Sequence, residues 1–78
     1  MADVVVRFWA GAQRAAGCAE QGLAADTLDE LVTALGRRPE LAKVCAAASF
    51  LVDGVQAGGT TKLHDGAIVD VLPPFAGG

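Results

Sequence analysis

The residues most able to do chemistry in this sequence are two consecutive glycines that follow a pair of prolines, Pro73 and Pro74. Each proline removes a backbone N–H and fixes φ, and a residue that precedes a proline is driven toward extended geometry. We therefore expect a strand to end at Leu72 and the chain to turn away from the sheet there. Residues 75–78 would then form a flexible tail with little side-chain bulk. That tail consists of Phe75, Ala76, Gly77 and Gly78.

A slender tail of this kind can enter a narrow channel and present its α-carboxylate to the active site of a partner protein. The carboxylate of Gly78 is a poor electrophile because it is anionic and resonance-stabilised, so acyl chemistry would require prior activation, for instance as an acyl-adenylate. Glycine suits this position because it places no Cβ beside the reacting carbon. The alternative is a frayed end without a role, which is the usual state of chain termini.

The rest of the sequence lacks conventional catalytic equipment. His64 is the sole histidine, so neither a Ser-His-Asp triad nor a histidine-based metal site can be assembled, and its place in a turn fits a solvated residue. Cys18 and Cys45 are too far apart for a CxxC pair, and we expect both to be reduced and structural. No phosphate-binding glycine motif is present. We therefore expect no metal site, no bound cofactor and no catalytic site in this chain alone, with ATP used only by a partner.

Charge and composition exclude several classes of partner. The 78 residues carry a formal net charge of −3, which provides no basic surface for nucleic acid or for an anionic membrane. No apolar run approaches the ~20 residues that span a bilayer, and Asp3 stands where a signal peptide would carry positive charge. We expect a cytoplasmic protein with one small domain, residues 1–74. Its 53% hydrophobic content is enough to fill a core.

The first half of the chain predicts a strand, a weaker strand and a helix. Residues 4–9 are β-branched or aromatic apart from one arginine, which is typical of a strand. Residues 10–16 favour one or two helical turns, and residues 18–23 a weak second strand. A capping box at Thr27 and Glu30 begins a helix. Period-two alternation in the first strand gives one face of Val4, Val6 and Phe8 and a less buried face of Val5, Arg7 and Trp9.

The second half predicts a further helix and two more strands. Pro39 can begin a short helix, and residues 49–52 form a strand that leads into an Asp53-Gly54 hairpin turn. A tight turn at residues 64–66 precedes the last strand, residues 67–72. This order indicates an α+β domain with a mixed sheet and helices on one face. The simplest compact arrangement is the ββαββ β-grasp (ubiquitin-like) fold, in which the first and last strands lie side by side and parallel.

That arrangement predicts the contents of the open face, the sheet face turned away from the helices. Arg7 and Asp70 would form a cross-strand ion pair, which contributes little if it is exposed. Trp9 and Leu72 would form an apolar patch beside the tail, where a partner could dock. The alternative is that helices or loops cover this patch.

The sequence also resembles the ubiquitin-like sulfur-carrier family MoaD/ThiS nearly from end to end, and most of all its molybdopterin synthase small-subunit branch. The opening VVVRFWAGAQRAAG is similar to the family's first strand and the stretch that follows it. The segment DTLDEL resembles the family's helix start, and LHDGAIVDVLPPFAGG resembles its ending. The final PPFAGG is the most specific piece, because thiazole-pathway relatives usually lack the double proline.

The resemblance implies a β-grasp fold and a reaction at Gly78, with Gly77 beside it. An E1-like (MoeB-like) adenylyltransferase would adenylate the Gly78 carboxylate, and a sulfur donor protein would convert it to a thiocarboxylate. The tail would then enter the large (MoaE-like) subunit of molybdopterin synthase and donate sulfur to the pterin precursor in molybdenum cofactor biosynthesis. The docking residues that the resemblance implies are Arg7, Trp9, Leu72, Phe75 and Ala76.

One departure from the family pattern leaves alternatives open. The family's arginine-glutamate pair after the first strand is replaced here by Gln13-Arg14, so partner contacts that depend on that charge order are not implied. A sulfur carrier for thiamine thiazole or cysteine biosynthesis is one alternative. A ubiquitin-like interaction module with an inert tail is another, and conjugation of the tail to lysines is a third.

Overall fold

The computed structural model of the chain describes residues 1–74. Three helices and five strands follow one another in these residues, in the order β1, α1, β2, α2, α3, β3, β4, β5. Their bounds are β1 Ala2–Phe8, α1 Gly11–Ala16, β2 Glu20–Ala25, α2 Leu28–Leu35, α3 Pro39–Ala47, β3 Ser49–Val52, β4 Val55–Gln56 and β5 Ile68–Leu72.

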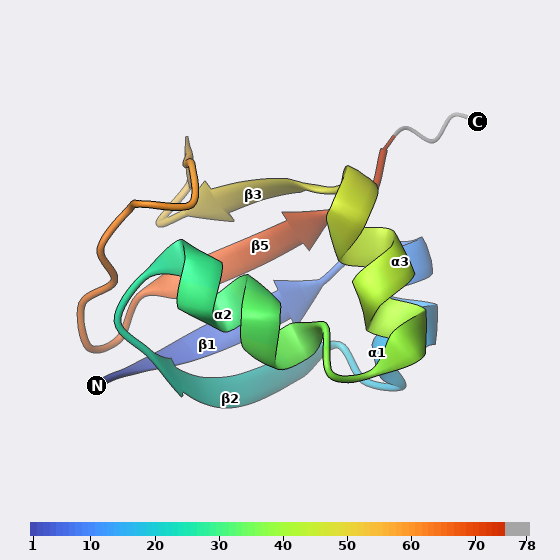
Figure 1. Ribbon diagram of the computed structural model, residues 1–78, viewed down its shortest axis with the longest axis horizontal. Coiled ribbons are helices and arrows are strands. Elements are labelled where there is room, and N and C mark those ends of the chain that lie inside the picture. Colours follow the sequence, from blue (N-terminus) through green and yellow to red (C-terminus); the bar gives the residue numbers. More distant parts are fainter. Residues whose placement is uncertain (75–78) are drawn as a thin grey trace.

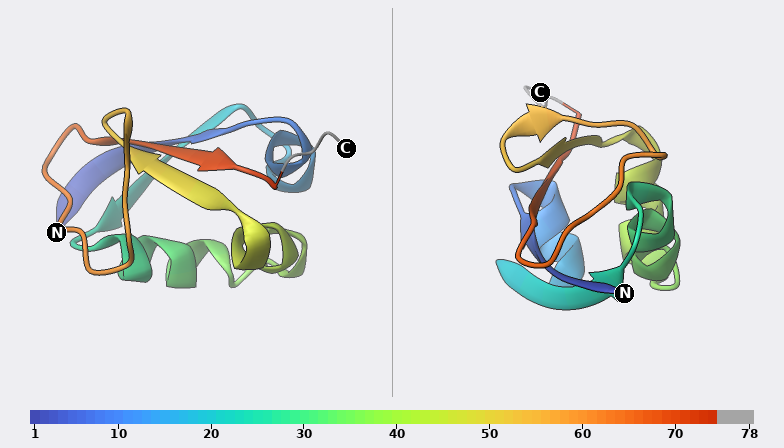
Figure 2. Two further views of the ribbon diagram at one scale, coloured as in Figure 1. Left: turned by 90° about the horizontal axis from the view of Figure 1, so that it is seen from above. Right: turned by 90° about the vertical axis from the view of Figure 1, so that its left-hand side faces the viewer.

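The strands form one mixed sheet in the spatial order β2-β1-β5-β3-β4. β1 and β5 are parallel neighbours near its centre, with Val6 opposite Val69 and Arg7 opposite Asp70. The other pairs are antiparallel. Helices α2 and α3 pack on one face of this sheet (Figures 1 and 2). The predicted β-grasp fold, with parallel first and last strands and helices on one face, is confirmed.

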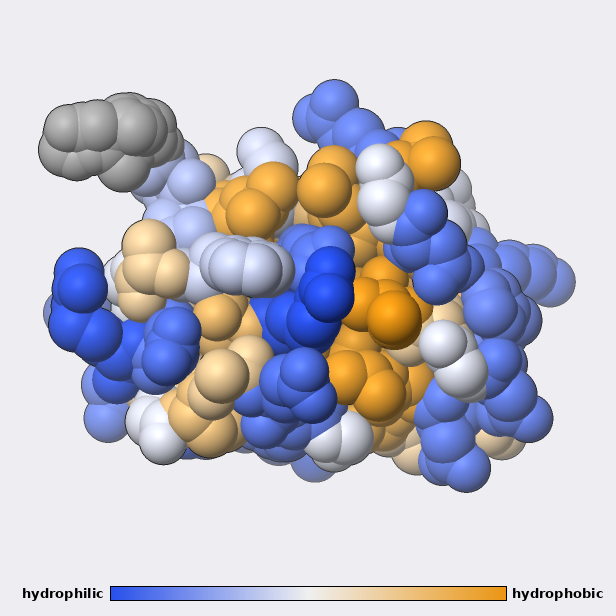
Figure 3. Space-filling model, turned by 180° about the vertical axis from the view of Figure 1, so that it is seen from behind, coloured by the Kyte–Doolittle hydropathy of each residue, from blue (hydrophilic) through white to orange (hydrophobic). Residues whose placement is uncertain are grey.

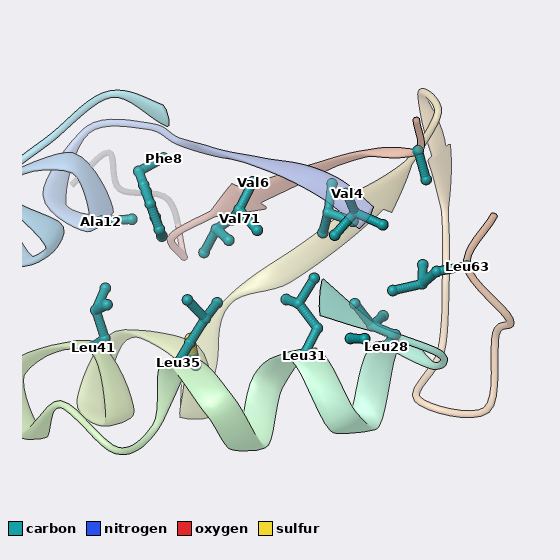
Figure 4. Close-up of a cluster of buried hydrophobic side chains, with 14 of the residues drawn as sticks. Val4, Val6, Phe8, Ala12, Leu28, Leu31, Leu35, Leu41, Leu63 and Val71 are labelled. Carbon is teal, nitrogen blue, oxygen red and sulfur yellow. The ribbon is translucent and has the colours of Figure 1, made fainter. Parts of the chain in front are cut away.

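The core forms where the inward faces of the central strands meet the helices. Figure 4 shows side chains of β1 and β5 pointing toward leucines of α2 and α3. The alternation predicted for β1 is confirmed, because its inward residues are almost completely buried. Close packing of this kind is what a domain of this size depends on for stability. The main contributors are Val4, Val6, Phe8, Leu28, Leu31, Leu35, Leu41, Val69 and Val71.

Helix α2 starts at the predicted cap, with one difference in its hydrogen bonds. The Glu30 backbone N–H donates to Thr27 Oγ1 at 3.2 Å, as a capping box requires. The Glu30 carboxylate, however, accepts from the backbone N–H of Asp26 at 2.8 Å and so reaches one residue beyond the cap. The backbone N–H groups of Leu28 and Asp29 donate to carbonyls of the loop between β4 and β5. That loop therefore closes the start of the helix.

Arg38 binds the end of a helix that is distant from it in sequence. The sequence places it close to the end of α2, but its Nη2 donates to the carbonyl oxygens of Ala15 and Ala16, at 3.3 and 2.9 Å. These carbonyls lie in the last turn of α1, where a cation is favoured. Arg38 thus ties α1 to the start of α3.

Two predicted turns are confirmed, and one short strand was not predicted. Asp53 and Gly54 both have positive φ, 51° and 83°, which is the geometry of a two-residue hairpin turn. The turn joins β3 to β4, a strand of two residues that exists only through its pairing with β3. The second turn closes with the Ala67 N–H donating to the His64 carbonyl at 3.0 Å. The weak second strand is real but begins at Glu20 and ends at Ala25.

Candidate functional site

The central strand β5 leads directly to the double proline. β5 lies between β1 and β3, and it ends at Leu72 as predicted. Pro73 is half-buried and Pro74 is exposed. In Figure 1, β5 runs toward the end of the domain that carries α1 and α3. The expected site residues Phe75, Ala76, Gly77 and Gly78 lie outside the described residues, and the predicted flexible tail over residues 75–78 stays a prediction.

The open face is composed of residues whose positions follow from the strand register. Arg7 lies opposite Asp70 on β5, and Asp70 lies opposite Leu51 on β3. This polar pair crosses the middle of an otherwise largely apolar face. Figure 3 shows hydrophobic surface on both sides of a strongly hydrophilic strip in this view from behind the helices. The apolar members of the open face are Val5, Trp9, Leu51, Ile68 and Leu72.

Asp70 is the centre of a cluster of three side chains that we call the Arg7–Trp9–Asp70 cluster. The Arg7 guanidinium donates twice, from Nε to Oδ1 at 2.7 Å and from Nη2 to Oδ2 at 3.1 Å. The Trp9 indole Nε1–H donates to Asp70 Oδ1 at 2.9 Å. The Arg7 guanidinium carbon also lies 5.6 Å from the centroid of the Trp9 ring, within the range of a cation–π interaction.

These contacts decide the charge state of the cluster. The hydrogen bonds from Arg7 and Trp9 hold the pKa of the Asp70 carboxyl below its ordinary value, although burial acts in the opposite sense. The hydrogen bond to Asp70 in turn raises the pKa of Arg7. Asp70 is therefore an anion at neutral pH, and the buried carboxylate is fully paired.

The predicted ion pair between Arg7 and Asp70 is present, but it is not the exposed surface pair that we considered. Asp70 is 5% exposed, whereas the Arg7 side chain is 39% exposed. Trp9 is 46% exposed and Leu72 is half-buried, so residues 1–74 leave the indole accessible.

The Trp9–Asp70 hydrogen bond was not predicted. Strand alternation had placed both residues on one face, and a half-buried indole N–H usually finds an acceptor, so the sequence did carry a signal for it.

A second polar cluster lies at the opposite end of β5. His64 Nε2 is 2.6 Å from Asp53 Oδ2, and His64 Nδ1 is 2.7 Å from the carbonyl oxygen of Asp65. Asp53 Oδ1 also accepts from the Ile68 backbone N–H at 3.0 Å. The hydrogen bond with Asp53 raises the pKa of His64. His64 is exposed, as predicted for a turn residue, but it links the β3–β4 hairpin to the segment before β5.

Cys18 and Cys45 are both free thiols, and burial raises the pKa of the Cys45 thiol, so Cys45 stays protonated at neutral pH. Within residues 1–74, no three side chains of the metal-binding types come together. None of the helices in this part of the chain has the length and apolar character needed to cross a bilayer.

Known structures share this fold over nearly their whole length. Small archaeal modifier protein 1 from Methanosarcina acetivorans matches with a TM-score of 0.86 and 27% identity, over 100% of this chain and 98% of that one. A chain of the complex of subunits 1 and 2 of the molybdopterin-converting factor from Helicobacter pylori matches with a TM-score of 0.78 and 25% identity, over 97% and 99%. A putative molybdopterin converting factor subunit 1 from Pyrococcus furiosus, at 21% identity over 96% and 100% with a TM-score of 0.85, shows the fold alone. No curated protein gives a sequence match.

The β-grasp sheet, with parallel first and last strands, places the chain among proteins of ubiquitin-like fold. The ThiS family model matches residues 6–78, which is most of the sequence. The chain therefore belongs to the ThiS family, the ThiS/MoaD group of ubiquitin-like sulfur carriers.

Proposed function

We propose that this chain is the sulfur-donating small subunit of a molybdopterin synthase, acting in the cytoplasm. The observation that carries the proposal is the family match through residue 78, combined with the Pro73-Pro74 exit from the central strand of the sheet. The 25% identity to a chain of the Helicobacter pylori molybdopterin-converting factor complex supports this branch of the family.

The proposed chemistry takes place at Gly78. A carboxylate oxygen of Gly78 attacks the α-phosphorus of ATP on an E1-like enzyme, and pyrophosphate leaves. The terminal sulfur of a persulfide on a donor protein then attacks the acyl-adenylate carbonyl, and AMP leaves. A second thiol of the donor attacks the donor-side sulfur of the resulting acyl disulfide, which leaves a disulfide on the donor and a thiocarboxylate on Gly78. The ATP is bound by the activating enzyme, and the carrier contributes only its terminal acyl group. Gly77 and Ala76 keep the approach to that carbon free of bulk.

The open face would dock on the large subunit while the tail reaches its active site. Trp9 directly follows β1, and Leu72 is the last residue of β5. Both therefore lie near the point where the chain leaves the sheet, and docking there would aim the tail in a fixed direction. Phe75 would extend the apolar contact, and Arg7 would add a charge. Exposed aromatic and arginine residues of this kind are the usual anchors of protein interfaces.

A second function is supported by one observation. The match to small archaeal modifier protein 1, at 27% identity and a TM-score of 0.86, raises the alternative that the activated glycine is attached to lysines of other proteins. Both functions share the adenylation step and differ in the nucleophile that follows it. Sulfur transfer to thiamine thiazole or cysteine synthesis shares even the thiocarboxylate. An interaction module with an inert tail requires neither step.

Reconstitution with the proposed partner separates these alternatives. The thiocarboxylated chain, mixed with its large subunit and the pterin precursor, is expected to form the dithiolene product and to return with a free carboxylate. Trp9→Ala should weaken binding to the large subunit by more than ~1 kcal/mol without an equal loss of folding free energy. Normal thiocarboxylate formation without dithiolene product would assign the carrier to another pathway, and isopeptide-linked adducts would assign it to protein conjugation.

A further inference from the structure

Asp70 is the only charged residue that the structure buries among residues 1–74. It lies in the central strand, on a face where its neighbours Val5, Leu51 and Ile68 are apolar. A carboxylate is costly to bury unless it is paired and hydrogen-bonded. The fold does not require this cost, since replacing a buried ion pair by packed apolar residues is often neutral or stabilising.

The carboxylate instead determines where the Trp9 indole lies. Trp9 follows the last residue of β1 and is 46% exposed, so packing alone does not fix the position of its ring. Two contacts restrict it: the Nε1–H bond to Asp70 Oδ1 at 2.9 Å and the Arg7 guanidinium 5.6 Å from the ring centroid. Arg7 is itself fixed by its two bonds to the same carboxylate.

We propose that Asp70 and Arg7 are positioning residues that hold the Trp9 indole as a preformed anchor for a partner protein. This inference rests on the proposed function, in that the partner is the large subunit, and it adds how the anchor is held and what it fits. An anchor that is ordered before binding loses less side-chain entropy in the complex. The three side chains therefore act as one docking element, and Asp70 acts without touching the partner.

The geometry also specifies the complementary surface. The indole N–H is already occupied by Asp70, so the partner has to offer an apolar pocket for the ring and no hydrogen-bond acceptor for it. Arg7 has guanidinium N–H groups that Asp70 does not use, and its side chain is 39% exposed. A carboxylate or carbonyl oxygen at the rim of the pocket would pair with them. The partner is thus a protein with an apolar pocket and an acceptor at one side of it.

The free chain provides a direct test of the positioning role, because Trp9 is its only tryptophan and it contains no tyrosine. Time-resolved fluorescence anisotropy therefore reports the motion of this one indole. The double variant Arg7→Val/Asp70→Val removes all three hydrogen bonds and inserts residues that suit a strand. We expect it to stay folded and to gain a fast, large-amplitude depolarisation that is absent from the wild type. An indole as restricted in the folded double variant as in the wild type would overturn the inference.

Binding to the large subunit tests the anchor. The double variant should bind at least about tenfold more weakly than the wild type, the loss typical of a disabled interface anchor. Asp70→Asn retains an oxygen for the indole N–H and should recover part of both the restricted motion and the affinity. Val55→Ala, on exposed β4, is the matched control and should bind normally.

The outcomes separate the two proposals. A wild-type chain that does not bind the large subunit would overturn the proposed function. Normal wild-type binding together with unchanged affinity in the double variant would overturn the positioning role alone.

Discussion

Arg7 and Asp70 are unequal partners, because only the arginine can return to water. Asp70 is 5% exposed, so Arg7→Ala would strand a buried carboxylate. Asp70→Ala leaves an arginine that can turn to solvent. We expect both variants to be less stable than the wild type and Arg7→Ala to be the worse of the two.

Urea unfolding of both variants at neutral and at acidic pH measures this asymmetry. Loss of Arg7 should raise the pKa of Asp70, so the penalty of Arg7→Ala should shrink on acidification as the carboxyl gains a proton. Equal penalties for the two variants at neutral pH would show that Asp70 is more hydrated than its burial indicates.

His64 gives the chain a stability that depends on pH. Both of its ring nitrogens face oxygen acceptors, at Asp53 and Asp65, so the arrangement is complete only for the doubly protonated imidazolium. The pKa of His64 is raised above its ordinary value of 6.5. Its contribution is therefore fully present below about pH 6.5 and is lost as the pH rises through the higher pKa of the folded state.

Asp53 adds a dependence at acidic pH, because its hydrogen bonds with the Ile68 N–H and with His64 lower its pKa. The contribution of Asp53 to the stability of the fold is present above its ordinary pKa of about 3.9 and is lost as the pH falls through the lower pKa of the folded state. Denaturant unfolding from about pH 6 to about pH 8 should show wild-type stability falling, and His64→Gln should remove most of that fall. The same slope in both proteins would assign the pH dependence to other groups. The effect is expected to be small and sensitive to salt, since the pair is exposed.

The sequence predicted which face of the sheet the residues of the Arg7–Trp9–Asp70 cluster occupy, but not how deeply they are buried. Alternation placed Arg7, Trp9 and Asp70 on one face correctly. It could not show that the carboxylate is covered, because that depends on how neighbouring side chains fold over it. His64 and Asp53 are eleven positions apart, and only the pairing of the hairpin with β5 brings them together.

At the scale of elements, one hydroxyl contributes a separable part of the capping of α2. Thr27 Oγ1 accepts from the Glu30 N–H at 3.2 Å. The backbone of Thr27 also forms an isolated β-bridge with Lys62, in the loop that precedes β5. Thr27→Ala should lower the free energy of unfolding by about 1 kcal/mol. Thr27→Ser keeps the hydroxyl and should cost less, and thermal and urea unfolding measure both. Equal losses in the two variants would indicate that the methyl group, rather than the cap, is what matters.

The elements were predictable to different degrees for identifiable reasons. β1 and α2 carry strong local patterns of apolar residues and so appear in the sequence with the correct faces. β2 alternates Glu20, Gly22 and Ala24 on its outer face, which is a weak signal, and its pairing with β1 defines it instead. β4 has two residues and no pattern of its own. The predicted flexible tail, residues 75–78, lies outside the described part of the chain and stays a prediction.

At the scale of the whole molecule, the β-grasp topology places the end of β5 in the middle of the sheet. β5 is surrounded by β1 and β3 and is anchored by the buried Val69 and Val71. The chain that leaves it at Pro73 therefore starts from a rigid point beside Trp9 and the open face. The same sheet that stabilises the domain thus fixes the open face, our proposed docking surface, relative to the point at which the chain leaves β5.

If Gly78 is activated and carries sulfur, as we propose, the intact mass of the chain has to change. The chain would be incubated with ATP, a sulfur source and an extract of its own organism. A variant lacking Gly78 and a reaction lacking ATP serve as controls. We expect a gain in mass equal to the replacement of one terminal oxygen by sulfur, absent from both controls. An unchanged mass, in an extract that modifies a known sulfur carrier, would contradict the account and leave a ubiquitin-like interaction module.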